Sequence, residues 1–158
     1  MKKYLLLVLA VISTAFTSCS SDEDKNCKEE FYRIDQLQQN FLFPTTQFQV
    51  KGIQIGQYTV IKNETEFQNR VNGSSYYKDI INFKDFDLLV GQVKVQGVLS
   101  IIDIIPMLKE NCSNNSVNKL EVEMIFNKGI NNPIVTYHAL VPKSRTYNIE
   151  VRTSVNLK

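Results

Sequence analysis

The sequence predicts a small α+β domain that is rich in β-strand, with a mostly antiparallel sheet or sandwich and one or two helices. Three observations support this fold class. Apolar and polar residues alternate along several segments, as they do in strands that bury one face. Turn-forming Asn, Gly and Pro residues separate these segments at short intervals. One stretch carries a clear helix start, a helical spacing of apolar residues and a helix stop.

The first 18 residues are organised like a bacterial lipoprotein signal peptide. Lys2 and Lys3 precede an apolar run that is shorter than the roughly 20 residues of a spanning helix. The run ends at Phe16-Thr17-Ser18-Cys19, which resembles the site where a cysteine is acylated, for example with palmitate, and becomes the first mature residue. An ordinary secretory signal cleaved near Ser18 is the alternative. We expect residues 1–18 to be removed and Cys19 to carry the lipid.

Residues 19–27 contain no apolar residue apart from cysteine. Such a segment buries too little surface to offset its ordering entropy, so we expect a flexible acidic tether. Its Ser-Ser-Asp-Glu-Asp run resembles the segment that directs some Gram-negative lipoproteins to the outer membrane and its outer face. We therefore expect a protein that is lipid-anchored in the outer membrane and exposed at the cell surface. Residues 28–158 have the length of one ordinary domain.

Cys27 and Cys112 remain as an even pair once Cys19 is acylated. In an oxidising compartment, the simplest interpretation is one disulfide between them. Two buried free thiols are the alternative.

The formal net charge of +2 belongs to the predicted precursor. Lys2 and Lys3 leave with the leader, after which basic and acidic residues balance. Binding to a phosphate backbone relies on a concentrated basic surface, so a neutral chain argues against nucleic acid as the partner.

Residues 63–72 form the clearest predicted helix. Asn63 or Thr65 can cap its first free amides, and Phe67 and Val71 lie four residues apart on one face. An Asn-Gly pair follows and suits a helix end, because glycine readily adopts the left-handed conformation.

A second helix is predicted over residues 28–43, where apolar residues recur at spacings of three and four before Pro44. The alternative is that Phe41-Leu42-Phe43 begins a strand. Strands are predicted in residues 45–62 (one bent strand or a pair), within 76–97, and over 98–108, 120–126, 134–141 and 147–155. We expect Pro106 to break the third of these.

The sequence offers little for catalysis. His138 is the only histidine, and a catalytic or metal-binding role needs partners that no recognisable motif supplies. We expect a structural or surface histidine. The pairs Asp85/Asp87 and Glu121/Glu123 alternate along strands and suit the solvated face of a sheet. These observations favour a protein that is not an enzyme and that carries no metal or cofactor.

Three segments together resemble a known family. They are Tyr58 to Phe67, Ile81 to Gly91 (Ile-Asn-Phe-Lys-Asp-Phe-Asp-Leu-Leu-Val-Gly) and Val135 to Lys143 (Val-Thr-Tyr-His-Ala-Leu-Val-Pro-Lys). Over residues 55–155 the chain resembles the C-terminal domain of the PrcB-like family of protease-complex components, which is common in exported bacterial lipoproteins. The glycine pair that follows the central strand in that family is replaced here by Gly97 between Gln96 and Val98.

The resemblance implies a non-enzymatic domain that supports a surface protease complex. Our leading hypothesis is therefore a membrane-anchored lipoprotein that acts as a protein-binding or scaffold module and contacts another envelope protein. The alternative is a small-ligand-binding lipoprotein that holds a lipid, glycan or metabolite in a cavity of the β-domain.

Overall fold

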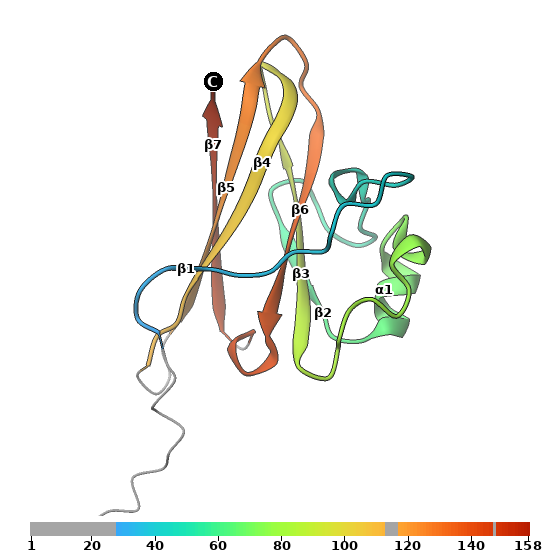
Figure 1. Ribbon diagram of the computed structural model, residues 1–158, viewed down its shortest axis with the longest axis vertical. Coiled ribbons are helices and arrows are strands. Elements are labelled where there is room, and N and C mark those ends of the chain that lie inside the picture. The colour runs from blue at the N-terminus through green and yellow to red at the C-terminus, as the bar shows by residue number, and fades with distance from the viewer. Residues whose placement is uncertain (1–27, 113–116, 147) are drawn as a thin grey trace, which may run out of the picture.

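The computed structural model describes residues 28–112, 117–146 and 148–158, which form two stacked β-sheets and one α-helix (Figure 1). Within these residues, one sheet has the strand order β1-β4-β5-β7 and the other has the order β2-β3-β6. The predicted β-rich α+β fold is confirmed. The strands are β1 (Tyr32–Arg33), β2 (Tyr58–Ile61), β3 (Phe86–Lys94), β4 (Val98–Lys109), β5 (Asn118–Lys128), β6 (Ile134–Pro142) and β7 (Ile149–Leu157). The helix is α1 (Glu64–Arg70), and short 3₁₀ helices are η2 (Thr45–Gln47), η3 (Ser74–Tyr77) and η4 (Lys143–Arg145).

Paired strands run antiparallel except β5 and β7, which run parallel. The chain reverses after β5 to enter β6 in the other sheet, and it reverses again through η4 (Figure 1). Two reversals bring β7 back in the direction of β5, so the last strand joins the four-stranded sheet as its parallel edge. The prediction of a mostly antiparallel sheet holds, with this one exception.

The main hydrophobic core fills the space between the two sheets. Strand β5 shows how alternation builds it, because every second residue is fully buried: Leu120, Val122, Met124 and Phe126. Glu121 and Glu123 alternate with these residues and lie on the opposite face, as predicted.

A glycine in the central strand makes room for an aromatic ring in this core. Gly91 of β3 lies opposite Tyr137 of β6. A Cβ atom on Gly91 would lie 2.2 Å from the Tyr137 ring. Burial raises the pKa of Tyr137 to about 12, so the ring is neutral in the core.

A second core covers the other face of the β2-β3-β6 sheet and gives the domain a third layer. Helix α1 begins as predicted, because the Asn63 side chain accepts the Glu66 backbone N–H at 2.8 Å. Its apolar stripe, Phe67 and Val71, is buried in this layer. Among the described residues, no helix has the length and apolar character needed to cross a membrane.

Residues 32–39, here called the strap, run extended between the edges of the two sheets (Figure 1). The helix predicted over residues 28–43 is therefore wrong. Ile34 and Leu37 are buried as the helical spacing suggests, but Phe31 is 38% exposed and Phe41 is 99% exposed. The apolar residues thus do not form one buried stripe.

The backbone of the strap bonds to both sheets instead of to itself. Ile34 donates its N–H to the carbonyl oxygen of Pro106 in β4 at 3.1 Å. The carbonyl oxygen of Asp35 accepts the N–H of Leu140 in β6 at 2.9 Å. Neighbouring residues therefore join the two sheets, and this pairing replaces the internal hydrogen bonds that a helix would make.

Two other strand predictions are corrected. Most of residues 45–62 is irregular, with η2, an isolated bridge between Val50 and Val71, and only Tyr58–Ile61 as a strand. Pro106 does not break its strand, because β4 continues to Lys109. The Pro106 carbonyl oxygen faces the strap, so its nitrogen also faces away from β5 and no ladder hydrogen bond is lost.

Candidate functional site

An open depression runs along the side of the domain where the strap and the start of β6 lie beside β4. Its first part, the strap pocket, lies between the strap and residues 101–104 and has a volume of about 540 Å³. Its second part, the distal groove, lies between residues 98–101 and 131–135 and has a volume of about 570 Å³. Thr46 and Ile101 line both parts, so the two form one continuous track.

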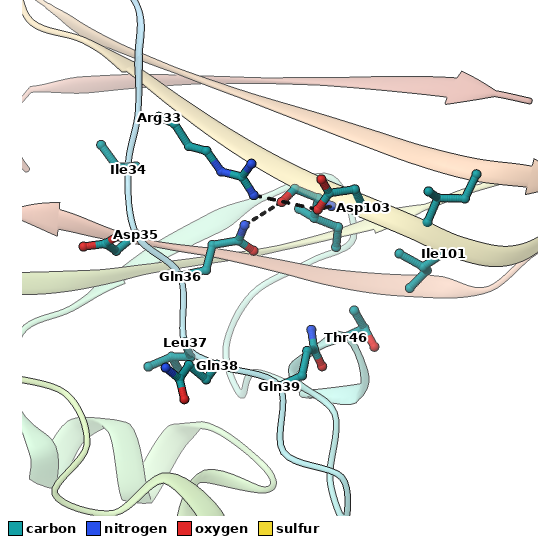
Figure 2. A pocket seen from close by; sticks show the side chains of 12 residues that line it. Arg33, Ile34, Asp35, Gln36, Leu37, Gln38, Gln39, Thr46, Ile101 and Asp103 are labelled. Atoms are coloured by element: carbon teal, nitrogen blue, oxygen red, sulfur yellow. Dashed lines mark hydrogen bonds and ion pairs between the residues drawn. The ribbon is translucent and has the colours of Figure 1, made fainter.

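The wall of the strap pocket is polar. Arg33 lies 3.9 Å from Asp103 in an ion pair between two largely exposed side chains. The Gln36 amide donates to the carbonyl oxygen of Ile104 at 2.5 Å. Figure 2 shows Arg33 and Gln36 reaching from the strap toward β4, with Gln39 beside Thr46. The pocket therefore presents amide and charged groups next to a strand edge.

The lining of the distal groove includes three aliphatic side chains that the core does not cover. Leu99 is 65% exposed, Ile101 is 39% exposed and Ile134 is 50% exposed. The first two belong to β4 and the third begins β6, so two sheets contribute to one apolar surface. Contiguous exposed apolar surface of this kind marks an interaction site more often than isolated apolar residues do.

Irregularities in β4 turn its side chains outward along this track. β1 covers the β4 edge only at Met107 and Leu108. The register between β4 and β5 shifts at Leu99 and again at Ile102, which are the extra residues of two bulges. The free part of the edge consequently presents side chains rather than a regular backbone ladder.

Polar side chains of β6 and β3 hold the opposite wall in place. The Thr136 hydroxyl donates to the carbonyl oxygen of Phe48, and the Gln92 amide donates to the same oxygen at 3.1 Å. Phe48 ends η2, which supplies Thr46 and Gln47 to the groove. The groove wall is thus fixed by hydrogen bonds between the second and third layers.

His138 holds the strap in the same way. Its Nε2 atom accepts the Leu37 N–H at 2.8 Å, and the residue is 1% exposed. Nδ1 therefore carries the proton of the neutral ring, and it has no partner within the described part of the chain. Burial lowers the pKa of His138 to about 4, so the ring is uncharged at neutral pH. His138 is a buried structural residue that positions the strap.

The carboxylates that the sequence singles out lie in different surroundings in the structure. In the described ranges, no three His, Cys, Asp or Glu side chains meet in a way that could hold a metal ion. Asp87 was expected on a solvated face, but it is 1% exposed and pairs with Lys143 at 2.9 Å and with the Thr146 hydroxyl at 2.6 Å. Lys143 also donates to the carbonyl oxygen of Phe83 at 3.0 Å, so this cluster closes the end of the domain.

Of the three cysteines with a predicted lipid or disulfide, the structure describes Cys112. Cys19 and Cys27 fall outside the described residues, and Cys112 follows the end of β4. The Glu110 N–H donates to the carbonyl oxygen of Lys28 at 3.0 Å. Lys28 directly follows Cys27, and Glu110 lies two positions before Cys112. The hydrogen bond therefore joins the residues next to the two predicted disulfide cysteines.

A buried carboxylate strengthens this junction. Glu110 is 6% exposed, pairs with Arg145 at 2.9 Å and accepts the hydroxyl of Tyr32. Burial, together with the Glu110 hydrogen bond, holds the pKa of Tyr32 well above its usual value. The first residues of the domain are therefore anchored beside the end of β4.

Sequence reasoning did not identify the depression. The sequence does contain an indication of exposed apolar surface in residues 98–105. Apolar side chains there occupy both faces of the strand, and the structure buries only some of them. Comparisons with family models, curated proteins and solved structures found no match.

Stability should depend on pH through His138. The unfolded histidine binds a proton below about pH 6.5, whereas the folded one does so only near pH 4. Acidification from pH 6.5 to pH 4 therefore favours unfolding, by about 3 kcal/mol for this group. We expect the free energy of unfolding to fall less steeply between pH 6.5 and pH 4 in His138→Gln than in wild type. Urea unfolding followed by circular dichroism at several pH values measures this slope. Equal pH slopes for the two proteins would contradict this role.

Proposed function

We propose that this chain is a non-enzymatic lipoprotein of the cell envelope whose domain binds another envelope protein. The strap pocket and the distal groove form the proposed binding site. The observation that carries the proposal is the continuous open track in which exposed aliphatic residues of two sheets adjoin amide and charged groups.

The shape and lining of the track favour a protein over a small ligand. Small-molecule sites are concave and bury most of the ligand surface. Here Leu99, Ile101 and Ile134 are exposed to solvent over two fifths to two thirds of their surface. The two parts of the track also have different chemistry, apolar in one and polar in the other. An extended polypeptide offers both kinds of group along its length.

The position of the site suits an anchored protein. The described chain enters beside the end of β4, where Lys28 bonds Glu110, whereas residues at the start of β4 line the distal groove. Figure 1 shows that these two ends of β4 lie at opposite ends of the domain. The twelve residues of β4 separate these points by about 40 Å. Anchoring through Cys19 would therefore leave the distal groove accessible to a partner.

A photo-crosslinking amino acid placed at Leu99 in the full chain should capture the partner in intact cells as a band of discrete mass. Ile80 is a matched control position, because it is an exposed aliphatic residue (60%) that lines neither part of the track. The Leu99 band should weaken several-fold in an Ile134→Glu background. It should persist in an Ile80→Glu background.

Absence of a discrete Leu99 band, or an equal band from Ile80, would count against the proposed site. Copurification of a small molecule that Ile134→Glu abolishes, without any protein crosslink, would favour the small-ligand alternative.

We also propose acylation at Cys19 and outer-membrane location facing the cell exterior, on the strength of the leader and the acidic run after it. Wild type should incorporate a labelled fatty-acid analogue and Cys19→Ala should not. Protease added to intact cells should remove the wild-type domain. An unlabelled wild-type protein would refute the anchor, and a protected domain would place it on the inner face.

A disulfide between Cys27 and Cys112 is the third element of the proposal. The bond between Lys28 and Glu110 brings the adjoining chain segments together, which a disulfide requires because its Cα atoms lie within about 7 Å. Peptide mapping without reductant should recover the two cysteine peptides joined. Recovery of both as alkylated free thiols from the native protein would support the free-thiol alternative.

A further inference from the structure

Strand β7 forms an edge of the four-stranded sheet that no described strand covers. It pairs with β5 from Ile149 to Leu157 on one side only. It contains no proline, and its register with β5 has no shift. A long regular edge is a template for pairing with another strand, and natural proteins usually protect it.

The other edge of the same sheet is protected in that way. The strap and β1 cover one part of β4, and Pro106 lies within the same stretch. Bulges at Leu99 and Ile102 interrupt the rest. Strand addition to this sheet is therefore possible at β7 and disfavoured at β4.

The hydrogen bonds of Lys158 define which backbone groups of β7 are available. Its N–H and C=O both bond to residues of β5. Because successive strand residues direct these groups to opposite sides, alternate residues of β7 direct theirs away from β5, with Val151, Thr153 and Val155 at the centre of the edge. The Tyr58 hydroxyl bonds the Ile149 carbonyl oxygen at 2.7 Å, which agrees with this direction.

The end of β7 also carries apolar side chains that the core does not cover. Ile149 and Val151 pack against the main core. Val155 and Leu157 follow on the same face and are 40% and 41% exposed. An added strand would cover these side chains together with the backbone groups of β7 that face away from β5. One of those groups, the Ile149 carbonyl oxygen, already accepts the Tyr58 hydroxyl.

We propose that β7 pairs with β7 of a second copy of this chain, antiparallel about a two-fold axis through Thr153. This register places every outward backbone group opposite another outward group. It also places Val151 opposite Val155 of the second copy, and Ile149 opposite Leu157. The strand is therefore complementary to itself, as a two-fold interface requires.

On the polar face of β7, the same register places no two like charges opposite each other. Glu150 lies opposite Asn156 of the second copy, and Arg152 lies opposite Ser154. Arg152 is already paired with Glu150 at 3.0 Å within its own chain, which balances its charge near the axis. The dimer forms one continuous sheet and leaves the distal groove, on the far edge of each copy, free for a different partner. The inference does not depend on the proposed binding role.

Thr153→Cys in the full chain, treated in membranes with a short bis-maleimide, tests the register. The two Thr153 side chains are directly opposite, so the membrane-bound chain should shift to a band of twice its own mass. Asn156→Cys is the matched control on the same strand. Its two thiols would be about 20 Å apart in this register and should not be joined. Wild-type protein treated in the same way shows how much dimer band the native cysteines give by themselves.

Val155→Pro in the Thr153→Cys background separates pairing from folding. It removes an outward N–H that the single chain does not use, so circular dichroism should be unchanged and the dimer band should disappear. A Thr153→Cys band no stronger than that of wild type or Asn156→Cys would overturn the proposal. So would crosslinking of Thr153→Cys to another protein in place of itself. If Thr153→Cys gives the dimer band but the photo-crosslinking amino acid at Leu99 captures no partner, only the proposed binding role is refuted.

Discussion

The domain depends on the strap that joins its two sheets. Ile34 bonds β4 and the next residue, Asp35, bonds β6, so two consecutive residues bridge the edges of both sheets. Leu37 then inserts beside His138 and passes the chain to the third layer. The relative placement of stacked sheets rests mainly on apolar packing, which is non-directional. The strap supplies directional bonds at the edges and fixes that placement, and with it the two walls of the proposed binding track.

The two edges of the four-stranded sheet differ in kind, and this difference organises the surface. Bulges, Pro106 and the strap interrupt the β4 edge, which leaves exposed side chains and a groove. The β7 edge keeps a regular backbone, and no strand of the described chain pairs with it on its outer side. The first edge can recognise the shape and chemistry of side chains, while the second offers hydrogen bonds that any strand of suitable register can use. One domain thus has two separate surfaces suited to association.

The sequence predicted the elements whose determinants are local. β5 and β6 were placed within a few residues, because alternation over a half-buried strand is a strong signal, and α1 was found through Asn63 and Phe67. The strap was mistaken for a helix because Ile34 and Leu37 have helical spacing, while its hydrogen-bond partners are far away in the sequence. The groove was missed for a related reason. Whether Leu99 is buried depends on which strand lies beside β4, and no local pattern contains that information.

The parallel pairing of β7 with β5, and the bond from Leu37 to His138 across 101 positions, also constrain how the domain folds. Most of its sheet contacts join distant parts of the chain, and such topologies fold slowly because long loops must close before the contacts form. The strap cannot dock on β6 until residues 134–142 have been synthesised, and β7 follows β6 in the chain. On the proposed route of export, the chain would therefore cross the membrane with its core incomplete, and its apolar strands would need protection during that interval.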